Sequence, residues 1–203
     1  MPKINNPIPA SGVLPDDYQE VFSWKVTGKP IRVITLNILG VLLFVIFGVI
    51  FSNLAVGLGK LPLESEFKVG LSEIGSVLAG FLLTLMLHEL THGLVMQMYG
   101  AKPRYGIIWK GLMLYATSPG YAYHRNNYVV VALAPFIFIS TLVVLGMLLW
   151  QGTLWVAFLG ICGIVNASGA VGDMWMTVIA LRYSAAAYVM DERDGIRVFL
   201  PNP

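Results

Sequence analysis

The chain has 203 residues, of which 57% are hydrophobic and only 12% are charged, whereas about a quarter of the residues in a soluble domain are charged. Its mean hydropathy is +0.73. The net charge of +2 is too small to indicate a nucleic-acid partner, and the single cysteine, Cys162, excludes an internal disulfide and a multi-cysteine zinc site. We therefore expect a polytopic membrane protein that lies in a lipid bilayer.

Residues 1–32 form a polar tail ahead of the first apolar run. The stretch from Leu14 to Glu20 has acidic residues where the first turn of a helix would be. Trp24 is followed by basic residues, as is common at a membrane interface. We expect a short interfacial helix in this tail. The apolar run begins near Val33 without a cleavage-site pattern, which indicates a retained anchor and not a signal peptide.

Four segments are long and apolar enough to cross about 30 Å of hydrocarbon, and they cover residues 33–58, 74–99, 128–150 and 153–181. Pro135 can kink the third of them. The 101–127 loop has apolar, strand-like runs on both sides of Lys110-Gly111, which predicts a small hairpin or re-entrant loop between helices two and three. The predicted fold class is therefore an all-α polytopic membrane protein with about four transmembrane helices.

The distribution of basic residues predicts the orientation. With four spans, the two tails and the middle loop share one side of the membrane. They hold eleven of the thirteen Lys and Arg, which leaves Lys60 and Lys68 opposite. The positive-inside rule then places both termini in the cytoplasm. In the C-terminal tail, Asp194-Gly195 stands between two apolar runs and predicts a hairpin.

The predicted organisation follows from these points. It comprises a cytoplasmic tail at 1–32, a transmembrane core at 33–181 and a second cytoplasmic tail at 182–203.

The second apolar segment contains the sequence His-Glu-Leu-Thr-His at 88–92. On a helix, His88 and His92 lie one turn apart on one face and can hold a single zinc ion, while Glu89 between them can act as general base. The alternative is a pair of core histidines beside an isolated glutamate. An ionisable side chain in an apolar segment is costly and usually marks function, so the motif favours a metal site.

A catalytic zinc site commonly has three protein ligands, and the third one is predicted to be Asp173. Residues 93–172 contain no Asp or Glu, so Asp173 is the next acid along the chain. At 1.5 Å per residue, His92 and Asp173 lie about 10 and 12 Å from the cytoplasmic ends of their segments, hence at similar depth. The alternative is that Asp173 pairs with a buried basic residue, but the four segments contain none.

Two further polar residues have open roles. His124 lies in a loop with several aromatic residues and is either an interfacial residue or a ligand or substrate contact. Asn166 is spaced to share a helix face with Asp173. It could hydrogen-bond a substrate carbonyl or oxyanion, or it could only bridge helices.

From about residue 14 to 201, the chain resembles a family of small prokaryotic membrane proteins described as zincin peptidases, which are related in plan to the site-2 type of intramembrane metalloprotease. The resemblance rests on residues 88–93, 116–120, 132–136 and 166–173. It implies that His88, His92 and Asp173 bind zinc and that Glu89 is the catalytic base. The site-2 pattern has Leu-Asp-Gly at the third ligand, whereas Gly172 precedes Asp173 here and Met174 follows it.

The predicted function is that of a zinc-dependent intramembrane metalloprotease of the prokaryotic cell membrane. Its partners would be the lipid bilayer and a membrane-associated protein or peptide substrate, with no nucleic acid. Two alternatives are a non-enzymatic metal-binding or metal-transporting membrane protein and a pseudo-protease scaffold. Both would keep the metal ligands and have little need for Glu89.

Overall fold

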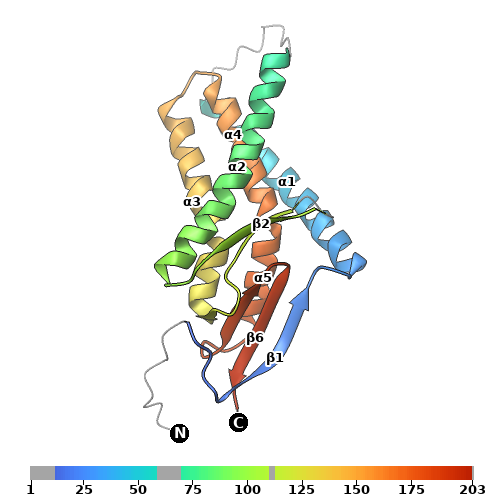
Figure 1. The fold of residues 1–203 in the computed structure, drawn as a ribbon. Helices are drawn as coiled ribbons and strands as arrows, with labels where there is room; N and C mark the ends of the chain where they lie inside the picture. Colours follow the sequence, from blue (N-terminus) through green and yellow to red (C-terminus); the bar gives the residue numbers. More distant parts are fainter. Residues whose placement is uncertain (1–11, 59–69, 110–112, 203) are drawn as a thin grey trace. The chain divides into compact units, whose positions relative to one another are not determined.

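The computed structural model describes residues 12–58, 70–109 and 113–202. The described elements are, in chain order, β1 (Tyr18–Lys25), α1 (Pro30–Leu58), α2 (Leu71–Met98), β2 (Arg104–Ile108), β3 (Met113–Thr117), β4 (Ala122–His124), α3 (Arg125–Leu149), α4 (Trp155–Gly169), α5 (Val171–Leu181), β5 (Tyr188–Glu192) and β6 (Gly195–Pro201) (Figure 1). The chain divides into two compact units. We call residues 34–91 with 134–172 the helical unit, and the rest the sheet unit.

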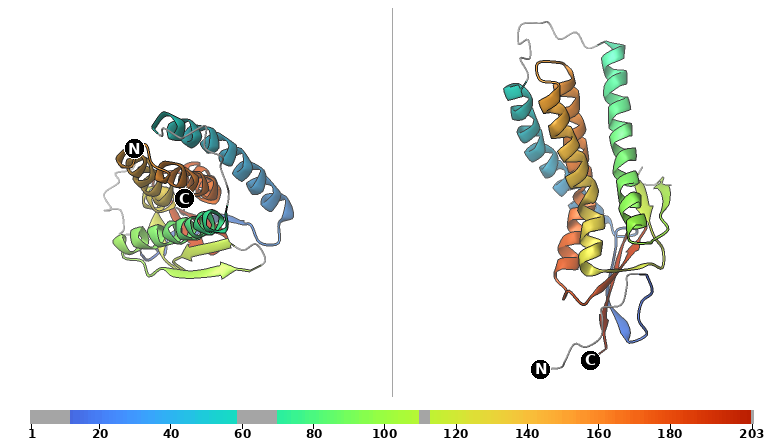
Figure 2. Two further views of the ribbon diagram at one scale, coloured as in Figure 1. Left: turned by 90° about the horizontal axis from the view of Figure 1, so that it is seen from above. Right: turned by 90° about the vertical axis from the view of Figure 1, so that its left-hand side faces the viewer.

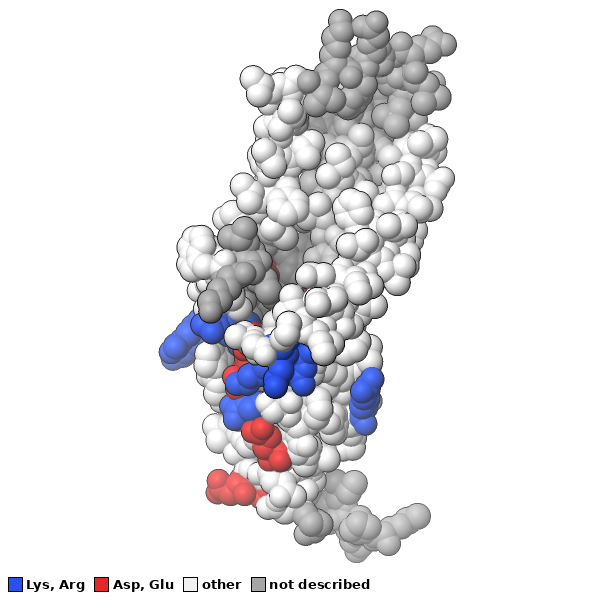
Figure 3. Space-filling view, turned by 90° about the vertical axis from the view of Figure 1, so that its right-hand side faces the viewer, with Lys and Arg blue, Asp and Glu red and all other residues white. Residues whose placement is uncertain are grey.

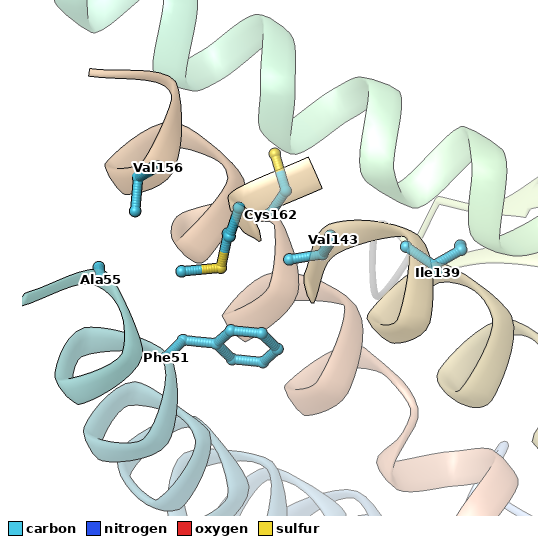
Figure 4. Close-up of a cluster of buried hydrophobic side chains, with 7 residues drawn as sticks. Phe51, Ala55, Ile139, Val143, Val156 and Cys162 are labelled. Carbon is cyan, nitrogen blue, oxygen red and sulfur yellow. The ribbon is translucent and has the colours of Figure 1, made fainter. Parts of the chain in front are cut away.

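The core of the helical unit lies where α1, α3 and α4 pack together. Its buried residues are Phe51, Ala55, Ile139, Val143, Met147, Val156 and Cys162 (Figure 4). Glycines allow this close packing, because a Cβ atom on Gly163 of α4 would lie 2.6 Å from the Phe51 ring, and one on Gly80 of α2 would lie 2.6 Å from the Phe158 ring. Gly163 and Gly80 therefore serve close packing of α4 with its neighbouring helices.

The predicted apolar segments are helical. Three helices, α1, α2 from Ile74 onward and α3, are long and apolar enough to cross a membrane. The fourth segment differs from the prediction, because it breaks at Ala170 into α4 and α5, which are bent by 41°. If the bent pair is one span, the described part of the chain has four. Lys60 and Lys68, on which the predicted orientation partly depends, lie outside the described residues.

The sheet unit contains a four-stranded antiparallel sheet with strand order β1-β6-β5-β4. Its first strand, β1, pairs along β6, so that Tyr18 lies opposite Pro201 and Lys25 opposite Gly195 (Figure 1). The interfacial helix predicted in the N-terminal tail is therefore wrong for these residues. Tyr, Val, Phe and Trp favour a strand, and β6 supplies hydrogen-bond partners that local sequence does not reveal.

Two hairpins complete the sheet unit. Strands β5 and β6 pair around the Asp194-Gly195 position that predicted a hairpin. Strands β2 and β3 form a separate hairpin from the 101–127 loop, beside the end of α2 (Figure 2). Lys110-Gly111, at its predicted turn, lies outside the described residues. The fold is thus mostly helical with small sheets, and the expectation of a purely all-α protein is wrong, because the polar segments that flank the apolar helices pair as strands.

The described basic residues are confined to one of the two units. Every described Lys and Arg belongs to the sheet unit, and on the face shown in Figure 3 these side chains gather together. Some of them form ion pairs, with Lys25 at 3.1 Å from Glu192, and Arg197 at 2.6 Å from Glu192 and 3.5 Å from Glu20.

Candidate metal centre

Helix α2 sets the spacing of the two histidines. It runs without interruption from Leu71 to Met98, so His88 and His92 lie about 6 Å apart along its axis and on one face. Both side chains are buried, with 6% and 7% of their surface exposed. Burial of two imidazoles in an apolar helix requires partners for their ring nitrogens, and each histidine has one.

His92 is held by the backbone of α3. Its Nδ1 lies 2.9 Å from the carbonyl oxygen of Val131. A carbonyl can only accept, so Nδ1 carries a proton, and in the neutral imidazole Nε2 then has the lone pair. This carbonyl is available because Pro135, four residues later in the helix, has no backbone N–H to donate to it.

His88 is held by Asn166 of α4, with Nδ1 3.0 Å from Asn166 Oδ1. The Nδ2 atom of Asn166 lies 3.2 Å from the carbonyl oxygen of Pro135 and 3.2 Å from Ser140 Oγ. Because the carbonyl needs a donor, the amide nitrogen faces α3 and the amide oxygen faces His88. His88 Nδ1 is then the donor and its Nε2 keeps a lone pair, as in His92.

Asp173 lies in the first turn of α5. The break at Ala170 therefore places this carboxylate at a helix N-terminus, where the backbone dipoles favour a negative charge. Its Oδ1 is 3.4 Å from His92 Nε2, and 22% of its side chain is exposed. A contact between the imidazole lone pair and a carboxylate needs either a proton or a cation between them.

Within the described residues, His88, His92 and Asp173 form a group whose ligand atoms all lie within 4.8 Å of one another. Ligands at about 2.1 Å from a tetrahedral zinc are about 3.4 Å apart, which matches the separation of His92 Nε2 and Asp173 Oδ1. Two neutral imidazoles with fixed tautomers and one carboxylate are a donor set that suits zinc. The residues present therefore fit the predicted metal.

Glu89 is half-buried on α2, one residue after His88. One residue corresponds to about 100° around the helix, so Glu89 lies beside the histidine face and not on it. This position suits a base that acts next to the metal. Its catalytic role stays a prediction.

His124 lies in β4, outside the three-residue group, and its ring packs on Tyr188 with centroids 4.9 Å apart. Burial lowers the pKa of its imidazole, and a hydrogen bond with the backbone of Ala185 partly opposes this shift. A ligand or substrate role for His124 stays a prediction. For Asn166, the described contacts are with His88 and α3, and an interaction with substrate stays a prediction.

Sequence reasoning missed the hydrogen-bond partners of the histidines. It treated Pro135 only as a kink, although a proline inside a helix also leaves the carbonyl four residues earlier without a donor. The position of Pro135 therefore identifies the Val131 carbonyl as a free acceptor, and this could have been predicted from the sequence. The contact of Asn166 with His88 joins residues that are 78 positions apart, and no local pattern predicts it.

The β2–β3 hairpin packs against α2 directly after His92. A Cβ atom on Gly93 would lie 1.8 Å from the Tyr105 hydroxyl oxygen, so the ring of Tyr105 occupies the place of a side chain there. Gly93 is buried. Glycine at this position therefore lets the hairpin approach the helix next to the candidate metal ligand.

A buried His-Glu-x-x-His helix with a third acidic ligand defines a zincin-type site. The chain belongs to the family described as "Putative zincin peptidase", whose model matches residues 81–188, more than half of the chain. The predicted family is thereby confirmed, while the likeness to site-2 proteases stays a prediction. No curated protein and no solved structure was found to match.

Proposed function

We propose that the protein is a zinc-dependent intramembrane metallopeptidase. The observation that carries this proposal is the group of His88, His92 and Asp173, in which both imidazoles donate through Nδ1 and keep Nε2 for a metal. Such fixed tautomers are typical of zinc-binding histidines. Histidines that only filled a core would not need a carboxylate beside them.

His88, His92 and Asp173 would hold the zinc ion. When bound, zinc would polarise the scissile carbonyl and make a nearby water more acidic. Asn166 and the Val131 carbonyl act as positioning groups, because they fix the orientation and the tautomer of each imidazole.

Glu89 is proposed to carry the proton transfers. Its carboxylate takes a proton from the attacking water while the water oxygen bonds to the carbonyl carbon of the peptide. It then gives that proton to the leaving amine nitrogen as the C–N bond breaks. One group therefore serves first as base and then as acid, and no other proton donor is required.

The proposed setting is the cytoplasmic half of a prokaryotic cell membrane, with both chain termini in the cytoplasm. Support comes from the three to four helices that are long and apolar enough to span and from the location of all described basic residues in the sheet unit. The substrates would be membrane-associated proteins or peptides. A plan like that of site-2 proteases belongs to this proposal.

The decisive experiment compares Glu89→Gln with the wild type in purified full-length protein. Zinc content and cleavage of unfolded peptides are measured for both, and Glu20→Gln on the exposed face of β1 serves as the matched control. We expect Glu89→Gln to keep its zinc and lose cleavage by orders of magnitude. Wild-type protein that binds zinc but cleaves no peptide would be a metal-binding or scaffold protein and not a peptidase. Wild-type cleavage by Glu89→Gln would instead exclude Glu89 as the base.

A further inference from the structure

A second candidate binding site lies in the sheet unit. A pocket of about 330 Å³ is lined by Gly100, Lys102, Arg104 and the turn at 118–121. None of these residues belongs to the candidate metal centre. Its two sides come from the segment that leaves α2 and from the segment that joins β3 to β4.

Both sides of the pocket have a defined backbone. Gly100 ends α2 with a φ of +88°, and the next N–H, of Ala101, donates to the Met96 carbonyl at 3.0 Å. This is the usual glycine termination of a helix. On the other side, Tyr121 N–H donates to the Ser118 carbonyl at 3.1 Å, with Pro119 second and Gly120 third at a φ of +77°, which is a type II turn.

The hydroxyl groups of the turn are already used within the protein. The Ser118 hydroxyl lies 2.7 Å from the Tyr123 hydroxyl, and the Tyr121 hydroxyl donates to the Tyr99 carbonyl. These hydrogen bonds hold the 118–121 turn in place beside the end of α2. The side-chain donors that the pocket offers to a ligand are therefore the ammonium of Lys102 and the guanidinium of Arg104.

Lys102 and Arg104 are the basic residues that line this pocket. Both are exposed, no acidic residue lines the pocket, and neither cation has an ion pair among the described residues. By contrast, Lys25 and Arg197 are paired with carboxylates. Two cations that line one pocket and have no ion pair within the described part of the chain attract an anion with several acceptor oxygens.

We propose that this pocket binds the phosphate headgroup of an anionic phospholipid. The pocket begins two residues after the end of α2, a helix long and apolar enough to span a membrane, so it lies where headgroups are expected. Leu94 and Met98, one turn apart on α2, are 60% and 83% exposed. These exposed apolar side chains on the last turns of α2 would contact the acyl chains of the bound lipid.

The test uses full-length protein in detergent micelles that contain equal amounts of phosphatidylglycerol and phosphatidylcholine, with bound lipids counted by native mass spectrometry. The variant Lys102→Gln/Arg104→Gln is compared with Lys29→Gln/Arg182→Gln, which removes the same charge from exposed positions outside the pocket. We expect the pocket variant to bind phosphatidylglycerol at least roughly tenfold more weakly and the control to match the wild type. Equal losses in both variants, or no loss in the pocket variant, would overturn the proposal.

Two further measurements keep the proposal testable. Inorganic phosphate at millimolar concentration should not displace the lipid, and displacement would assign the pocket to a soluble anion instead. In wild-type protein, a photoactivatable phosphatidylglycerol should crosslink to residues 94–121. Crosslinks spread evenly over the apolar helices would contradict a specific site, even if a variant failed to fold.

Discussion

The carbonyl oxygen of Val131 accepts a hydrogen bond from His92 Nδ1 at 2.9 Å. In an ordinary helix this oxygen would accept from the N–H of residue 135, but that residue is proline. A helix irregularity in α3 is thus what presents an acceptor to a histidine of α2. Helix geometry and ligand orientation are coupled at this point, and the coupling can be tested.

Replacing Pro135 with Ala should lower the affinity for zinc and at the same time raise the stability of the protein. Alanine restores the N–H that competes for the Val131 carbonyl, so zinc affinity should fall about tenfold, the lower end of the range for such partners. The helix itself should become more stable, since proline costs about 3 kcal/mol in a helix interior. Zinc affinity is measured by competition with a chelator, and thermal unfolding is followed in the metal-free protein. An unchanged affinity would refute the coupling.

Asn166→Ala should weaken zinc binding and also destabilise the protein. The substitution removes the acceptor of the buried His88 ring, together with the hydrogen bonds of Asn166 to Pro135 and Ser140 of α3, and a buried polar group left unpaired costs about 1–3 kcal/mol. Asn53→Ala is the matched control, because Asn53 is exposed and bonds only locally to Val49. Zinc stoichiometry and the midpoint of thermal unfolding provide the two readouts. If both variants behave alike, Asn166 does not position His88.

Gly93→Ala should disturb the hairpin next to the metal centre. The new methyl group meets the Tyr105 ring, and we expect a loss of about 1–3 kcal/mol in the free energy of unfolding. In a Tyr105→Ala background, the same change should be neutral or stabilising, because alanine is favoured over glycine in a helix by about 1 kcal/mol. A double-mutant cycle measures this coupling. Additive effects would show that the hairpin and α2 do not restrain each other.

Acid should weaken the sheet unit through His124. Burial lowers the pKa of its imidazole in the folded protein, so between that value and about 6.5 the unfolded chain binds more protons. Stability therefore rises with pH across this window and is lost as the pH falls below about 6.5. The unfolding midpoint is compared at pH 7.5 and 5.5 for wild type and His124→Gln. The variant should lose less stability on acidification, and an identical loss would exclude His124 as the cause.

The candidate site was largely predictable because its signals are local or compositional. The spacing of His88 and His92 follows from helix geometry. Asp173 followed from the absence of any other acid between residues 93 and 172, and the structure brings it to 3.4 Å from His92. Zinc binding and catalysis by Glu89 stay predictions until they are measured.

The features that the sequence did not predict depend mainly on contacts between residues that are far apart in the chain. The strand character of Tyr18–Lys25 requires β6, whose paired residues lie 170 to 183 positions later. The acids at 16 and 17 favoured a helix locally. The break at Ala170 was hidden because the hydropathy continues across it. The contact of Asn166 with His88 was hidden because it depends on how α2 and α4 pack and not on either sequence alone.

The central position of β6 has a consequence for biosynthesis. Strand β6 pairs with both β1 and β5, and the ribosome makes it after every other described element. Strand β1 therefore has no partner while the five described helices are synthesised. A chain that terminates before residue 195 would leave two strand edges open at once, although every predicted metal ligand would already be present. The sheet can therefore be completed only after translation has passed residue 201. Premature products would expose strand edges that can pair with other chains.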